Sequence, residues 1–68
     1  MKLSDLLDIL TEDTKVCVRG GSFDEITASP DDLLHIAVYK VVNAKVIEAL
    51  PVGKEIIQVW VDENELGE

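Results

Sequence analysis

The chain has 68 residues, a net charge of −8 and a hydrophobic fraction of 47%. This length excludes a second domain, and a domain this small buries only about 60% of the surface that its unfolded chain exposes. The single cysteine excludes an internal disulfide, and one histidine with one cysteine is too few for a structural zinc site. Self-association, most simply as a homodimer, therefore becomes an expected source of stability.

The distribution of charge narrows the class of partner. Residues 1–13 carry −3, residues 14–45 are balanced, and residues 46–68 carry −5. Nucleic acids and anionic membranes are bound by basic surfaces, so neither is expected as a direct partner. No apolar run approaches the ~18 residues of a membrane span, and the N-terminus has no signal-peptide core. We expect a cytoplasmic protein whose acidic surface faces a basic partner protein or serves only solubility.

The first predicted element is a helix. Its leucines have the i, i+3, i+4, i+7 spacing of one helical face: Leu3, Leu6, Leu7 and Leu10. Ser4 is the expected N-cap. Residues 15–19 then alternate as a strand does, with Val16 and Val18 facing inward. Gly20 and Gly21 predict a tight hairpin turn with positive φ angles, and residues 23–28 form the returning strand.

A second helix is predicted over residues 30–42. Ser29 and Pro30 form a strong helix start, followed by acids at the positive end of the helix dipole. Residues 36–42 are rich in β-branched side chains and read alternatively as a strand. The apolar positions nevertheless share one helical face: Leu33, Leu34, Ala37, Val38, Val41 and Val42. The cap signal favours the helix.

Two further strands are expected, at residues 45–50 and 55–61, joined by a turn at 51–54. The last strand is apolar on both faces, so Trp60 either lies under a helix or packs against a second molecule. Residues 1–62 form one domain, and residues 63–68 are an acidic, frayed tail. The predicted fold is α+β in the order α-β-β-α-β-β, a mostly antiparallel four-stranded sheet packed by two helices.

Three segments carry a resemblance to known proteins. Residues 2–7 with 14–16, the Ser-Pro-Asp-Asp-Leu-Leu at 29–34, and the Ile-Ile-Gln-Val-Trp-Val at 56–61 resemble short uncharacterised proteins encoded by phages and prophages of Gram-positive bacteria. The last segment is similar to their I-x-I-W-V ending. This resemblance implies an accessory protein acting inside a bacterial cell, and it brings no catalytic or ligand-binding residues with it.

The sequence gives little indication of a catalytic site. Cys17 and His35 are the only cysteine and histidine, and Cys17 lies between Lys15 and Arg19, whose charges would lower its pKa modestly. His35 follows Asp31 and Asp32 at a spacing that helps bind a metal, but helix capping explains both acids. The glycine pair lacks the spacing of a phosphate-binding loop. We therefore expect no enzyme, no cofactor and no metal.

Binding surfaces are the remaining candidates. The outer side of the second helix offers His35, Ile36 and Tyr39, which alternatively pack under a loop or against the first helix. Trp60 is the second candidate. The third is a set of acids in the C-terminal third, namely Glu48, Glu55, Asp62 and Glu63. The expected function is a non-enzymatic acidic module that binds or inhibits a host protein with a basic surface, such as a nucleic-acid-handling or antiviral defence factor. The alternative is a homo-oligomeric structural protein.

Overall fold

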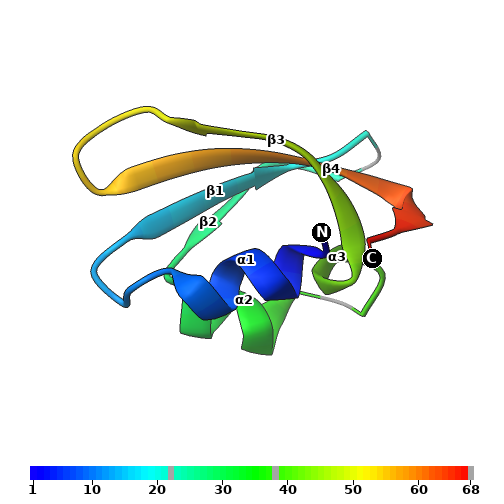
Figure 1. Ribbon diagram of the computed structural model, residues 1–68, viewed down its shortest axis with the longest axis horizontal. Coiled ribbons are helices and arrows are strands. Elements are labelled where there is room, and N and C mark those ends of the chain that lie inside the picture. The colour runs from blue at the N-terminus through cyan, green and yellow to red at the C-terminus, as the bar shows by residue number, and fades with distance from the viewer. Residues whose placement is uncertain (22, 38, 68) are drawn as a thin grey trace.

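The structure is a computed structural model that describes residues 1–21, 23–37 and 39–67. Its elements are α1 (Leu3–Ile9), β1 (Lys15–Arg19), β2 (Ile26–Ala28), α2 (Pro30–Ile36), α3 (Tyr39–Val42), β3 (Ala44–Pro51) and β4 (Ile56–Leu66). The predicted α+β class and the four-stranded sheet are confirmed (Figure 1). The predictions for Val38 and Glu68 fall outside the described residues.

The strands lie in the order β2-β1-β4-β3. The outer pairs, β1–β2 and β3–β4, are antiparallel hairpins, whereas the central pair β1–β4 is parallel. The predicted antiparallel pairing is thus confirmed for the two hairpins, whereas the central pair β1–β4 was not predicted to be parallel. The parallel pair follows from the path of the chain, because β2 and β3 lie at opposite edges and the helical segment between them crosses one face of the sheet (Figure 1).

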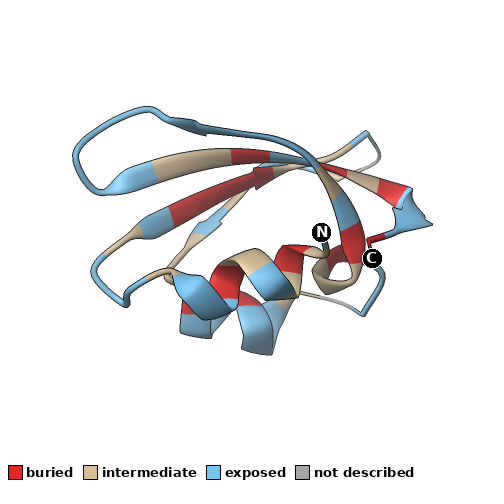
Figure 2. Cartoon of the chain, viewed as in Figure 1, coloured by how far each residue is buried: buried red, intermediate tan, exposed pale blue. Residues whose placement is uncertain are grey.

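The three helices lie on one face of the sheet, and no described element covers the other (Figure 1). Alternate side chains of the central strands point toward the helices, so Val16, Val18 and Val59 are fully buried against Leu3 and Leu33. Figure 2 shows buried residues along β1 and in the helices, while the far end of the β3–β4 hairpin is exposed. The core is therefore one thin layer between helices and sheet.

Helix α1 follows its leucine pattern. Leu3 and Leu7 are buried, and Leu6 and Leu10 pack at the margin of the core. The helix begins at Leu3 rather than after Ser4, so the predicted N-cap is wrong. The carboxylate of Asp5 instead accepts a hydrogen bond from the backbone N–H of Lys2 (3.3 Å) and so binds one of the free donors at the helix start.

The β1–β2 hairpin has a longer connection than predicted. Strand β2 begins only at Ile26, so the connection runs over residues 20–25. No described glycine has a positive φ, which corrects the expected tight turn at Gly20 and Gly21. Gly20 is instead needed for space, since a Cβ there would overlap the ring of Phe23. The absence of a side chain at Gly20 lets the ring of Phe23 pack against the core.

The predicted helix over residues 30–42 is two helices. Its start is confirmed, as Ser29 Oγ accepts a hydrogen bond from the N–H of Asp32 (3.3 Å). It ends at Ala37, whose backbone is extended (ψ 138°). The reason lies in the neighbours of each half: α2 packs on α1 and β2, whereas α3 packs on β4 and α1. One straight helix cannot follow both directions.

The C-terminal residues belong to the sheet. Strand β4 continues to Leu66, so the expected frayed tail is wrong for residues 63–66. Both ends of the chain bind at the start of β3: Gly67 N–H donates to Asn43 O (2.9 Å), and Met1 O accepts from the N–H of Val46 (2.9 Å). These bonds hold the C-terminal segment and the N-terminus at the same end of β3.

Candidate protein-binding surface

One face of the sheet is left open to solvent, and strand alternation decides which side chains it presents. In β4, Val59 and Val61 point into the core, so Trp60 between them points the other way, with 40% of its surface exposed. The strand register places the corresponding residues of the other strands on the same side. We call this surface the open face: Lys15, Cys17, Arg19, Thr27, Lys45, Glu48, Leu50, Ile56, Gln58, Trp60 and Asp62.

Trp60 occupies the centre of a cross-strand row. Its register partners are Arg19 in β1 and Glu48 in β3. The guanidinium of Arg19 lies over the indole ring, 5.5 Å from its centroid, within the range of a cation–π contact. Arg19 also donates from Nε (3.0 Å) and Nη2 (2.6 Å) to the same carboxylate oxygen of Glu25. Two contacts thus hold the cation on the ring.

Apolar side chains surround this row. Leu50 and Ile56 are 47% and 39% exposed on the open face. Ile47 is the extra residue of a bulge in β3, and it lines a shallow hollow of about 270 Å³ together with Trp60 and Asp62. A second hollow of about 290 Å³ is lined by Trp60 together with Arg19. Trp60 therefore borders two depressions, and an exposed aromatic side chain in an uneven surface suits a protein contact.

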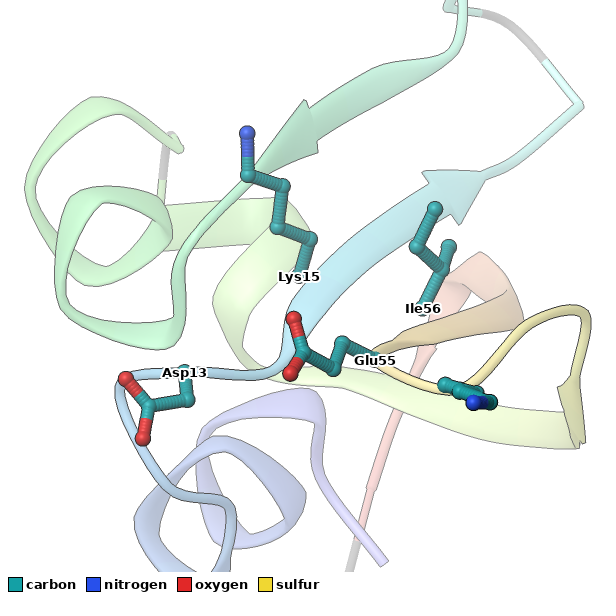
Figure 3. A pocket seen from close by; sticks show the side chains of 5 residues that line it. Asp13, Lys15, Glu55 and Ile56 are labelled. Carbon is teal, nitrogen blue, oxygen red and sulfur yellow. The ribbon is translucent and has the colours of Figure 1, made fainter.

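Another hollow, with a volume of about 560 Å³, lies at the far end of the sheet. It is lined by Asp13, Lys15, Lys54, Glu55 and Ile56. Figure 3 shows that the ammonium of Lys15 and the carboxylate of Asp13 point in opposite directions, and the side chains do not converge. Binding sites for small molecules hold a few convergent polar groups in an enclosed cavity. This open hollow has neither property.

Cys17 and His35 are not brought together. Cys17 is buried in the open face between β2 and β4, whereas His35 is exposed on α2 in the opposite layer. Burial, followed by the hydrogen bond and charge of Glu25, raises the pKa of the Cys17 thiol. The expected lowering of this pKa by Lys15 and Arg19 is therefore wrong, because desolvation and the carboxylate outweigh the cations.

His35 also has a local role. Its Nδ1 lies 2.7 Å from the carbonyl oxygen of Asp31, to which it donates within the helix. Among the described residues, no group of three His, Cys, Asp or Glu side chains is arranged to hold a metal ion. Within the same part of the chain, no helix is long and apolar enough to cross a membrane.

The predicted contact acids do not form one cluster. Glu48 and Asp62 lie on the open face beside Trp60, while Glu55 stands at the far end of β4. Glu63 borders the hollow beside Trp60 but is only 8% exposed, so little of it is available to a partner. The acidic array expected from proximity in sequence is therefore divided, because Glu55 is distant along the strand and Glu63 is buried.

The other predicted surface is exposed but not continuous. Ile36 and Tyr39 are 60% and 75% exposed, which excludes the alternative that both pack under a loop or on α1. They belong to different helices, α2 and α3, because the chain is extended at Ala37. His35, Ile36 and Tyr39 therefore do not share one helical face.

Sequence reasoning found Trp60 and its neighbour Ile56 from alternation along one strand. It missed Arg19, Ile47 and Leu50, because their proximity to Trp60 depends on strand order and on the bulge in β3. The two-sided apolar pattern of residues 56–61 was the only signal of an open apolar face. Comparison with protein-family models, with curated protein sequences and with solved structures finds no match.

Proposed function

We propose that this chain is a non-enzymatic protein-binding module that makes contact through the open face of its sheet. The observation that carries the proposal is Trp60, which is held by Arg19 on an uncovered surface that also exposes Leu50 and Ile56. Tryptophan and arginine are the residues most enriched at the energetic centres of protein interfaces. An apolar patch rimmed by polar side chains is typical of such a contact.

The absence of a convergent site in the described residues supports binding rather than catalysis. The thiol of Cys17 is buried and its pKa is raised, which disfavours the thiolate that nucleophilic chemistry requires. The only described histidine donates from Nδ1 to its own helix. The open face instead presents exposed apolar side chains beside shallow hollows, which are features of a binding surface.

A contact with a basic host protein is a second candidate, and a different surface favours it. The exposed acids of α1 and α2, namely Asp5, Asp8, Asp31 and Asp32, lie on the helical layer and attract basic groups over a distance. The resemblance to phage and prophage proteins supports a partner inside a bacterial cell. Inhibition of a host factor would then use the helical layer.

The test compares two single substitutions of exposed side chains. Tagged wild-type protein, Trp60→Ser and the control Ile9→Ser are immobilised and exposed both to bacterial lysate and to the purified chain. Ile9 is a suitable control because it is 71% exposed on α1, away from the open face. We expect wild-type protein and Ile9→Ser to retain a binding partner that Trp60→Ser loses. Equal retention by all three, or none by any, contradicts the proposal.

A further inference from the structure

The open face carries much less net charge than the protein as a whole. It presents the basic side chains of Lys15, Arg19 and Lys45 and the acidic ones of Glu48 and Asp62, and the adjoining Glu25 and Glu65 pair with Arg19 and Lys45. The whole chain carries −8, so the excess of acid lies outside this surface. The open face, which exposes Leu50, Ile56 and Trp60, is therefore also a surface on which a like-charged partner meets little net repulsion.

The edges of the sheet are poorly suited to pairing with another strand. At the free edge of β3, the start is occupied by the N-terminus, since Met1 O accepts from the N–H of Val46 and Lys2 bridges to Lys45. The strand ends at Pro51, which has no N–H to donate. The opposite edge, β2, has only three residues. Such features protect sheets from edge-to-edge association, so the face is the available surface.

We propose that the partner at the open face is a second copy of this chain, packed sheet against sheet about a two-fold axis. The inference rests on the proposed function, because it names the partner of the same surface. Face-to-face sheets pack about 10 Å apart. This arrangement buries both copies of Trp60 and directs both acidic helical layers outward. Those layers are then separated by more than the screening length of about 8 Å in physiological salt.

The area of the face makes the dimer interface a small one. Four strands about 4.8 Å apart and roughly six residues long present about 400 Å² in projection. A standard interface buries about 800 Å² of accessible surface per partner. We therefore expect a weak, rapidly exchanging dimer, which is sought at micromolar concentrations.

Sedimentation equilibrium tests this proposal with the purified full chain. The average mass of wild-type protein should rise toward that of a dimer as its concentration increases into the high micromolar range. Trp60→Ser and Leu50→Glu should remain monomeric, and the control Ile9→Ser should behave as wild type. All three replaced side chains are at least 40% exposed, so circular dichroism and urea titration should show a folded monomer.

The effect of salt separates this dimer from a complex with a basic partner. At low ionic strength the screening length is about 30 Å, so two copies of charge −8 repel across the dimer. Adding sodium chloride to a low-salt solution should therefore strengthen the dimer. A complex between acidic and basic surfaces weakens under the same change. Fluorescence quenching of Trp60, the only tryptophan, gives a second readout: wild-type indole should become less accessible to acrylamide as dimer forms.

Two results would overturn the inference. Wild-type protein that stays monomeric at the highest concentration excludes the dimer. A dimer that persists in both Trp60→Ser and Leu50→Glu is held by another surface. The proposed function survives the first result if lysate capture still depends on Trp60, and it falls with the inference if no Trp60-dependent partner exists.

Discussion

The guanidinium of Arg19 lies 5.5 Å from the ring centroid of Trp60, across the parallel junction of β1 and β4. This pair joins the N-terminal hairpin to the C-terminal one on the side of the sheet that the helices leave open. Glu25 also binds the guanidinium, through an ion pair of 2.6 Å.

Replacing Arg19 should expose the indole without unfolding the protein. In Arg19→Met the aliphatic stem remains but the cation and its bonds to Glu25 are lost. We expect acrylamide to quench the fluorescence of Trp60 more efficiently in dilute, monomeric protein. Lys40→Met, which removes an exposed cation on α3, is the control and should leave quenching unchanged. Equal quenching in all three proteins would show that Arg19 does not cover the ring.

Adjacent leucines in α2 should differ sharply in their effect on stability. Leu33 is 0% exposed in the core, whereas Leu34 is 39% exposed. Truncation of a fully buried leucine to alanine costs about 2–5 kcal/mol, because transfer free energy is lost and a cavity remains. We expect Leu33→Ala to unfold at a much lower urea concentration, and Leu34→Ala to change the free energy of unfolding by less than about 1 kcal/mol. Similar urea midpoints for the two variants would place the core elsewhere.

Gly67 should not tolerate a side chain, although its φ angle is ordinary. A Cβ there would lie 2.5 Å from the backbone N and Cα of Lys2 and from Met1 O. Gly67→Ala should displace the N-terminus, weaken its hydrogen bond to Val46 and cost about 1–3 kcal/mol in thermal or urea unfolding. Gly53→Ala is the matched control, because the nearest atom to its Cβ is 3.9 Å away. The expectation fails if both variants unfold alike.

Cys17 should react slowly with alkylating reagents in the folded protein. Burial, and then the hydrogen bond that the thiol donates to Glu25, raise the pKa of Cys17 above the ordinary value of 9.0. The rate of alkylation by iodoacetamide should begin to rise at a higher pH in the folded protein than in the urea-unfolded chain. Glu25→Gln should move the profile part of the way back, since it leaves the larger cause, desolvation, in place.

The same raised pKa makes stability depend on pH. Between the unfolded and the folded pKa of Cys17, the folded state binds more protons than the unfolded state. The contribution of the protonated Cys17 thiol to the free energy of unfolding is therefore fully present below about pH 9 and is lost as pH rises through the folded pKa. Urea unfolding of wild-type protein and Cys17→Ser over this range should show a steeper loss in the wild type. Parallel curves would contradict the assignment.

Local patterns determined several elements from the sequence alone. The leucine spacing of residues 3–10 predicted α1, and alternation around Val16 and Val18 predicted β1 with its buried side chains. Ser29 and Pro30 predicted where α2 begins. Each of these signals lies within a few neighbouring residues, because hydrophobic periodicity and capping are local properties of the chain.

Only the tertiary structure decided the features that depend on distant segments. The division between α2 and α3 follows from their packing on different strands, and Glu63 is buried because β4 continues past residue 62. The sequence determined that Trp60 lies on an apolar strand and that the chain is acidic. The parallel pairing of β1 with β4 placed Arg19 beside Trp60, and the packing of the helices on the other face of the sheet left this pair uncovered (Figure 1). Such a contact joins residues 41 positions apart, and no local signal specifies it.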